Sequence, residues 1–168
     1  MAVDIKKQML KFKKQLTGLV EDSTSKEVMT EVGEEAVRLI KQQARIGKDY
    51  KTGQKFKPLS EEYIEKRDEY SDYLDETARK SKSNVTATGQ MVDSVKVTKV
   101  GPKTVEVAAT GTRSASPFGG GNISNAEVAF YVESQGRHWL GLSKKSKARI
   151  ENFYKRIVNG LIRKSRKT

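Results

Sequence analysis

The sequence predicts an α+β fold with N-terminal helices, a small antiparallel β-sheet with a hairpin, and a long basic C-terminal helix. Three observations lead to this prediction. Apolar residues recur at helical spacing near both ends of the chain, and a stretch around Gly101-Pro102 alternates with the period of a strand. The residues from Arg137 onward also carry most of the net positive charge.

A chain of 168 residues is long enough to bury one hydrophobic core and short for two. We therefore expect a single domain, residues 1–168, with four parts. They are an N-terminal helical region (1–47), a loop and helix (48–84), a β-rich core (85–142) that includes a flexible loop (110–125), and the C-terminal helix (143–168).

The N-terminal region contains two helical patterns. The first predicts an amphipathic helix that ends near Gly18 or soon after, and its apolar residues are Ile5, Met9, Phe12, Leu16 and Leu19. The second follows N-cap candidates at 23–25 and ends before Gly47, which we expect at the C′ position. Its apolar residues are Val28, Val32, Ala36, Leu39, Ile40 and Ala44.

A third helix is predicted to begin near Glu61, because Ser60 can act as its N-cap and acidic residues follow in its first turn. Its end is expected to fray through the polar stretch 71–84. This stretch has few apolar residues and is typical of an exposed loop.

The stretch "TATGQMVDSVKV" is expected to join the helical and β parts. Thr88 is predicted to cap a short turn that begins at Gly89, and Ser94 connects this turn to a strand starting near Val95. Valines on matched parity on both sides of Gly101-Pro102 predict a β-hairpin.

A glycine-rich loop follows the hairpin, and Asn125 is predicted to cap the apolar segment "AEVAFYVESQG". We expect this segment to be a helix that ends at Gly136, with a strand as the alternative. The stretch "RHWLGLS" is expected to be extended, and Ser143 is predicted to start the last helix. One face of that helix is apolar, through Ile150, Phe153, Ile157 and Leu161.

Charge points to the C-terminal segment as a contact surface. The net charge is +12. From Arg137 onward there are eleven Lys or Arg residues and one acidic residue, Glu151. The candidate contacts to DNA or to an acidic partner are Lys144, Lys145, Lys147 and Arg149. A solvated basic face is the alternative interpretation.

Enzyme chemistry is not expected from this sequence, and neither is a cofactor or a metal. There is no Cys, and His138 is the single His, so thiolate catalysis and a His-rich zinc site are excluded. The acidic cluster within 61–76 is interleaved with cations and is typical of a solvated helix face.

For His138-Trp139 we favour core packing, with anchoring of an interface as the alternative. No apolar run approaches the roughly 20 residues of a membrane span, so we expect no membrane contact.

The order of four stretches resembles a known family. These are "GQKFKPLSEEYIEKR", "TATGQMVDSVKV", "AEVAFYVESQG" and "RHWLGLSKKSKARIENFYKRIVNGLI". They resemble the tail-completion and virion-morphogenesis proteins of tailed bacteriophages, which act at the neck and in head-tail joining, over roughly Gly53 to Leu161. In that family a Leu-x-x-Thr-Gly-x-Leu-x-x-Ser motif introduces a β-region, and Arg-Pro-Phe-Leu-Gly-Leu-Ser leads into the final helix.

The family motifs fall on two sets of residues in this chain. The first set is Thr88, Gly89, Met91 and Ser94, and the second is Trp139, Leu140, Gly141, Leu142 and Ser143. Two positions depart from the pattern. The leucine expected before Thr-Gly is Val85 or absent, and the proline before the aromatic residue is His138.

The resemblance implies a non-enzymatic structural protein of the virion. It would form a homo-oligomeric ring, a hexamer in the family, at the neck or at the head-proximal end of the tail, as a tail terminator, neck or completion protein. Its partners would be other neck, connector or tail proteins, with packaged DNA in the lumen as a further contact. Its location would be the virion, and the host cytoplasm during assembly. The alternative is a nucleic-acid-binding protein, without sequence specificity, that uses the basic C-terminal helix.

Overall fold

The computed structural model describes residues 5–70, 72, 74, 85–113 and 122–166, and the predicted α+β fold is confirmed. Within these residues the elements are α1 (Ile5–Ser23), α2 (Lys26–Arg45), α3 (Glu61–Glu69), α4 (Gln90–Asp93), β1 (Val95–Val100), β2 (Val105–Ala109), α5 (Asn125–Ser134) and α6 (Lys144–Ser165).

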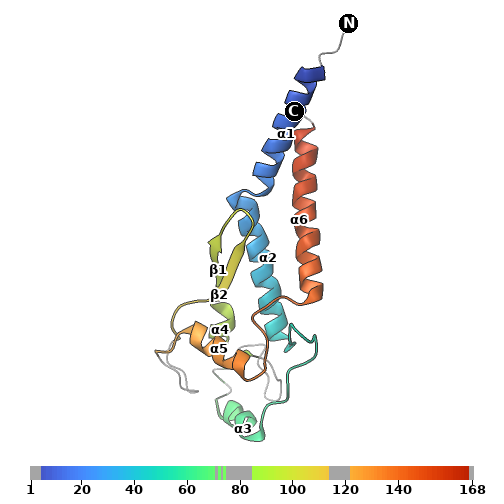
Figure 1. Cartoon of the computed structure of the whole chain (residues 1–168). Coiled ribbons are helices and arrows are strands. Elements are labelled where there is room, and N and C mark those ends of the chain that lie inside the picture. Colours follow the sequence, from blue (N-terminus) through green and yellow to red (C-terminus); the bar gives the residue numbers. More distant parts are fainter. Residues whose placement is uncertain (1–4, 71, 73, 75–84, 114–121, 167–168) are drawn as a thin grey trace.

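Helix α2 is the central element of the molecule. The β1-β2 hairpin lies against one side of α2 and α6 runs along another, while α1 continues beyond the hairpin beside the C-terminal half of α6 (Figure 1). Helices α3, α4 and α5 lie at the opposite end from the two termini. The α1-α6 pair therefore forms an arm that extends away from the rest of the molecule.

The two strands form the predicted antiparallel hairpin. Val97 pairs with Val107 and Val95 with Ala109, so the valines of the two strands share a face as their parity predicts. The register shifts between Val97 and Lys99, which marks a bulge.

Gly33 of α2 allows the hairpin to approach the helix closely. A Cβ at this position would lie 2.7 Å from a methyl group of Val97 and 2.7 Å from one of Val105. Only a residue without a side chain leaves room for both valines.

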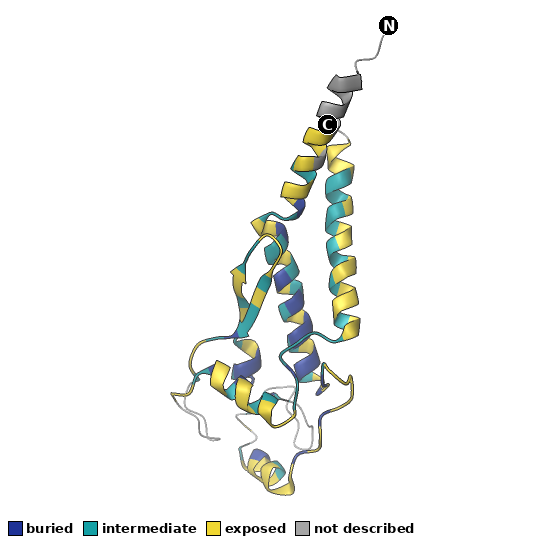
Figure 2. Ribbon diagram, in the orientation of Figure 1, coloured by how far each residue is buried: buried dark blue, intermediate teal, exposed yellow. Residues whose placement is uncertain are grey.

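The hydrophobic core lies at the C-terminal end of α2, where the buried residues gather (Figure 2). Ile40 and Ala44 contribute from α2, and Trp139 is completely buried. The other buried members are Phe56, Met91, Val92, Val95, Ala109 and Ala129. This agrees with the interpretation of Trp139 as a core residue.

Serine residues cap four of the described helices. The hydroxyl groups of Ser25, Ser60, Ser124 and Ser143 each accept a hydrogen bond from a backbone N–H in the first turn of α2, α3, α5 and α6. Three of these helix starts, at residues 25, 60 and 143, are those predicted from the sequence. Gly47 and Gly136 follow α2 and α5 with φ values of 72° and 75°, as expected for C′ glycines.

Two predicted caps are wrong. Gly89, with φ of 76°, occupies the N-cap of α4 without a side-chain hydrogen bond, so Thr88 does not cap this turn. Ser124 caps α5 in a capping box with Glu127, and Asn125 is instead the first helical residue. Its side-chain amide donates a hydrogen bond to the carbonyl oxygen of Thr110, 2.9 Å away, which ties α5 to the end of β2.

Other boundaries also differ from prediction. Helix α1, predicted to end near Gly18 or soon after, continues to Ser23. The region 85–142, predicted to be rich in β-structure, contains two helices as well as the hairpin. The helix predicted for the apolar segment before Gly136 is confirmed at 125–134, and the alternative strand does not form. Most of the polar stretch 71–84, and residues 114–121 of the predicted flexible loop, lie outside the described residues. The described ends of that loop are joined by a β-bridge between Thr112 and Ser124.

We expect Gly33→Ala to lower the free energy of unfolding by about 1–3 kcal/mol, because the new methyl group would overlap Val97 and Val105. Urea unfolding followed by the fluorescence of Trp139, at one fixed protein concentration, measures this change. The control is Gly160→Ala in α6, where no atom lies within 4 Å of the added Cβ. This control should raise stability by about 0.5–1 kcal/mol. An unchanged Gly33→Ala protein would show that α2 and the hairpin are not in close contact.

Candidate functional site

The Thr-Gly motif forms a structural joint around α4. Met91 and Val92 are buried in the core, and Gly89 adopts the left-handed conformation that starts the turn. The Ser94 hydroxyl donates to the carbonyl oxygen of Met91 at 2.7 Å. The carbonyl oxygen of Ser94 accepts hydrogen bonds from the backbone N–H and the hydroxyl of Thr110. The motif therefore connects α4 to the end of the hairpin.

Two cations of α2 also hold α4 in place. Lys41 donates to the carbonyl oxygen of Asp93 at 2.9 Å, and Arg45 forms an ion pair with the Asp93 carboxylate. Both contacts lie at the C-terminal end of α4, where a positive charge interacts favourably with the exposed carbonyl groups. Thr88 itself is half-buried and lines a groove described below.

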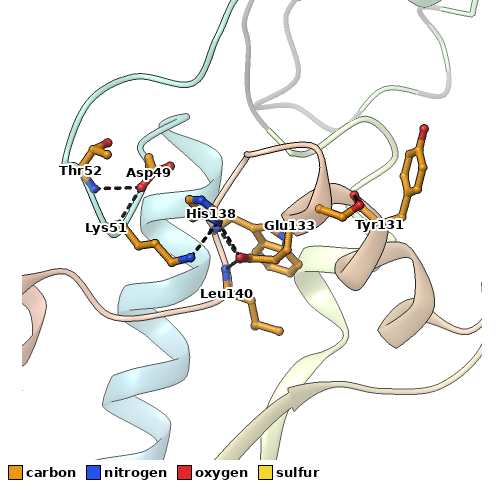
Figure 3. A network of polar contacts seen from close by, with 9 residues as sticks. Asp49, Lys51, Thr52, Tyr131, Glu133, His138 and Leu140 are labelled. Atoms are coloured by element: carbon orange, nitrogen blue, oxygen red, sulfur yellow. Dashed lines mark hydrogen bonds and ion pairs between the residues drawn. The ribbon is translucent and has the colours of Figure 1, made fainter.

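The second motif is held by the carboxylate of Glu133, in the last turn of α5. One oxygen of Glu133 accepts hydrogen bonds from the backbone N–H groups of Trp139 and Leu140, at 2.8 and 2.9 Å (Figure 3). The other oxygen lies 3.0 Å from Nδ1 of His138. Because one side chain binds three consecutive residues, it fixes the path of the extended segment that leads to α6.

His138 is part of this structural cluster. Its carbonyl oxygen accepts a hydrogen bond from the backbone N–H of Tyr50, and Lys51 Nζ lies 3.3 Å from its Nδ1. Gly141 packs against the ring of Tyr50, where a Cβ would lie 2.6 Å from the ring atoms. The loop after α2 and the segment 138–141 are therefore packed against each other and joined by hydrogen bonds. The positioned partner of His138, Glu133, was not found from the sequence.

Asp49 orders the loop that faces His138. Its carboxylate accepts hydrogen bonds from the backbone N–H groups of Lys51 and Thr52, at 2.7 and 3.0 Å (Figure 3). Burial acts to raise the pKa of this carboxyl, but the two hydrogen bonds and the charge of His138 outweigh it and lower the pKa. Asp49 therefore stabilises the fold above its unfolded-state pKa, and this contribution is lost as the pH falls through the lowered value.

The four predicted contact residues lie in the first two turns of α6. Lys144, Lys145 and Lys147 are exposed, whereas Arg149 also lies 3.4 Å from Glu35 of α2. The first turn of α6 contains no acidic residue. Lysines at this end of a helix oppose the helix dipole, which favours negative charge there. An anionic partner would relieve this unfavourable arrangement.

Helix α6 leaves its apolar face only partly covered. None of its 22 residues is buried, although α6 contacts α1 and α2, and Ile150, Phe153, Ile157 and Leu161 all have intermediate exposure. The described polar contacts of α6 with α1 and α2 include the bond from the Tyr154 hydroxyl to the carbonyl oxygen of Ser23 and the Arg149–Glu35 pair.

A groove of about 660 Å³ lies between α3, α4 and α5. Its walls are mostly apolar and include Leu59, Val85, Met91, Val128 and Val132. Two guanidinium groups, those of Arg113 and Arg137, also line it, together with one described carboxylate, that of Glu127. No pattern in the sequence indicates this groove, because its residues come from segments that are far apart in the chain.

Comparison with protein-family models, with curated proteins and with solved structures finds no match to this chain. Among the residues that the structure describes, no group of three or more His, Asp or Glu side chains is arranged to hold a metal ion. None of the described helices combines the length and the apolar character that crossing a lipid bilayer requires.

We expect Glu133→Ala to lower the free energy of unfolding by about 2–4 kcal/mol, since two partly buried backbone N–H groups lose their acceptor. Glu133→Gln, which can keep one acceptor oxygen, should have a smaller effect. Thermal and urea unfolding measure both changes, with Glu151→Ala on the exposed surface of α6 as a control expected within about 0.5 kcal/mol of the unsubstituted protein. Equal effects of the alanine variants at positions 133 and 151 would contradict the anchoring role.

Proposed function

We propose that this chain is a non-enzymatic structural protein of a tailed-phage virion. Copies of it assemble into a ring at the neck or at the head-proximal end of the tail, where the ring takes part in tail completion and head-tail joining. The proposal rests on the resemblance of the Thr-Gly and Trp-Leu-Gly-Leu-Ser motifs to that family. The structural observation that carries it is the apolar surface that the chain leaves open to a neighbour.

This open surface has two parts. The arm of α1 and α6 presents a 22-residue helix without a single buried residue. On α5, Phe130 and Tyr131 are 77% and 64% exposed. Apolar surface that stays exposed or half-buried in the isolated chain is typical of chains that bury it against another subunit. Ring closure requires heterologous contacts, in which two different faces of the subunit meet.

The described sheet supports the same proposal. It has two strands only, so each strand has one edge whose backbone groups are not paired within the sheet. A two-stranded sheet depends on packing against other elements for stability, and here α2 covers one face. An assembled ring would provide further cover.

The basic end of α6 supports a role for an anionic neighbour. Eight Lys or Arg residues and one acidic residue lie within Lys144–Ser165. In the proposed ring, part of this surface faces either packaged DNA in the lumen or an acidic protein above or below the ring. The electrostatic attraction acts over about 8–10 Å at physiological salt, so this surface needs close contact.

We expect the purified chain to form a discrete closed oligomer. Size-exclusion chromatography with light scattering gives its mass, and negative-stain electron microscopy shows whether the particles are rings. Phe153→Glu together with Ile157→Glu, on the half-buried face of α6, should shift the mass toward the monomer. Phe130→Ser tests the α5 surface separately and, at 77% exposure, should leave the fold intact. A monodisperse monomer at micromolar concentration, for the unsubstituted protein, would contradict the ring.

The role of the basic end is tested by changing Lys144, Lys145, Lys147 and Arg149 to Gln. We expect weaker head-tail joining or DNA retention in particles assembled with this variant, with unchanged unfolding of the isolated chain. A matched control removes four exposed lysines elsewhere, Lys48, Lys55, Lys96 and Lys103. Particles unaffected by the first variant would contradict a functional role for this surface.

The second candidate function, binding of nucleic acid, is favoured by the same exposed cations. A gel-shift experiment with random-sequence duplex DNA distinguishes the two functions. Affinity that falls steeply with salt, for a monomeric chain, would support the nucleic-acid-binding protein. A stable ring with negligible DNA affinity would support the structural protein.

A further inference from the structure

The groove between α3, α4 and α5 combines an apolar lining with unneutralised positive charge. Arg113 and Arg137 both line it, and their Nε atoms are buried without a hydrogen-bond partner among the described residues. A buried donor without an acceptor costs roughly 1–3 kcal/mol, and more when the group is charged. Two such donors in one groove indicate that an acceptor belongs there.

The carboxylate in the described lining, that of Glu127, does not accept hydrogen bonds from these two arginines. Glu127 is committed to the capping box of α5, where its carboxylate accepts from the Ser124 backbone N–H at 2.8 Å and from the Ser124 hydroxyl at 2.6 Å. These hydrogen bonds hold the pKa of Glu127 below its usual range, so the carboxylate stays ionised in the cap. Both bonds are made by its Oε2, and no ion pair between Glu127 and either arginine is found among the described residues.

A third arginine lies next to the groove. Arg67 of α3 is 1% exposed, donates to the carbonyl oxygen of Thr86 at 3.0 Å, and lies over the ring of Tyr63, which itself lines the groove. Burial lowers the pKa of Arg67, Tyr63 acts in the opposite direction, and the nearby charge of Arg137 lowers it further. An anion at Arg137 would reduce this repulsion between like charges.

The surroundings of the groove favour a macromolecular ligand. Its volume lies within the range of about 300–1,000 Å³ that is usual for binding clefts. Apolar surface continues past it, because Tyr131 and Ile123 of the lining are 64% and 42% exposed, and Phe130 beside them on α5 is more exposed still. Exposed aromatic side chains at the rim of an apolar groove are typical of protein-protein contacts.

We propose that this groove binds a peptide segment of another protein in which an Asp or Glu adjoins an apolar side chain. The carboxylate accepts hydrogen bonds from Arg113 and Arg137, and the apolar side chain lies against Val128, Val132 and Met91. Guanidinium groups form short, strong hydrogen bonds with carboxylates, and the apolar walls exclude water from them. A polynucleotide fits less well, because its phosphates and sugars are polar and would leave the apolar lining without an apolar partner.

This site goes beyond the proposed function and does not depend on it. A ring can close through α6 without the groove, and a monomeric chain would bind the same peptide. Loss of peptide binding with an intact ring, or a monomer that binds peptide, therefore separates the two proposals.

The test is selection of random short peptides on the full-length chain, followed by affinity measurement. We expect sequences with Asp or Glu next to Leu, Ile, Phe or Met to be enriched. Fluorescence anisotropy of the best peptide, and of the same peptide with its acid replaced by the amide, should differ by about tenfold in Kd. No enrichment, or enrichment of sequences without acids, would overturn the proposal.

Variants of the chain locate the binding to the groove. Arg113→Gln together with Arg137→Gln should weaken binding of the acidic peptide about tenfold or more. Ile123→Glu, at an exposed rim position, should also weaken it through charge repulsion and is not expected to disturb folding. The control, Lys103→Gln with Lys155→Gln, removes two exposed charges elsewhere and should leave the affinity unchanged. Equal loss in the control would show that net charge alone attracts the peptide and would overturn the site.

Two further outcomes identify a different occupant. If duplex DNA displaces the peptide and loses affinity in the double arginine variant, the groove is a phosphate site and the proposal fails. If instead the unsubstituted chain self-associates with rising concentration, and the double arginine variant does not, the occupant is a second copy. Both experiments use the same full-length proteins.

Discussion

The packing of the hairpin on α2 is the contact on which the rest of the structure depends. Gly33 lets Val97 and Val105 come close to the helix, and Ile40 and Ala44, two and three turns further along, form the centre of the core. The same helix contacts α4 and α6 on its other sides. One helix positions all these elements. A side chain at position 33 that moved the hairpin away from α2 would therefore also shift the α4 turn and the groove beside it.

This arrangement also explains why so much apolar surface stays open. The core gathers at the C-terminal end of α2, near the hairpin end, α4 and α5 (Figure 2), and it includes Trp139. Farther along, the main contacts of α6 among the described elements are with α1 and α2, and two or three helices side by side cannot enclose their apolar stripes. The arm is therefore the part of the chain whose apolar surface would be buried most by a second subunit.

Local signals in the sequence predicted most helix starts and ends, because serine caps and C′ glycines act within a few residues. Three serine caps, the two glycines at 47 and 136, and the parity of the hairpin valines were correct. Thr88 and Asn125 were wrong for the same reason, since another residue next to each one takes the cap. Glu133 and the groove could not be predicted, because hydrogen bonds across a turn and walls built from three helices are tertiary features that no local pattern encodes.

Charge limits how two copies can meet. The groove contains Arg113 and Arg137, and the first turns of α6 expose Lys144, Lys145 and Lys147. A contact that brought one of these surfaces onto the other would place like charges together, at a cost of free energy unless anions lay between them. Contacts between copies are therefore expected through the apolar face of α6 and the exposed aromatic residues of α5. The two cationic surfaces then stay available for partners that carry carboxylates or phosphates, and such contacts would join the ring to components other than itself.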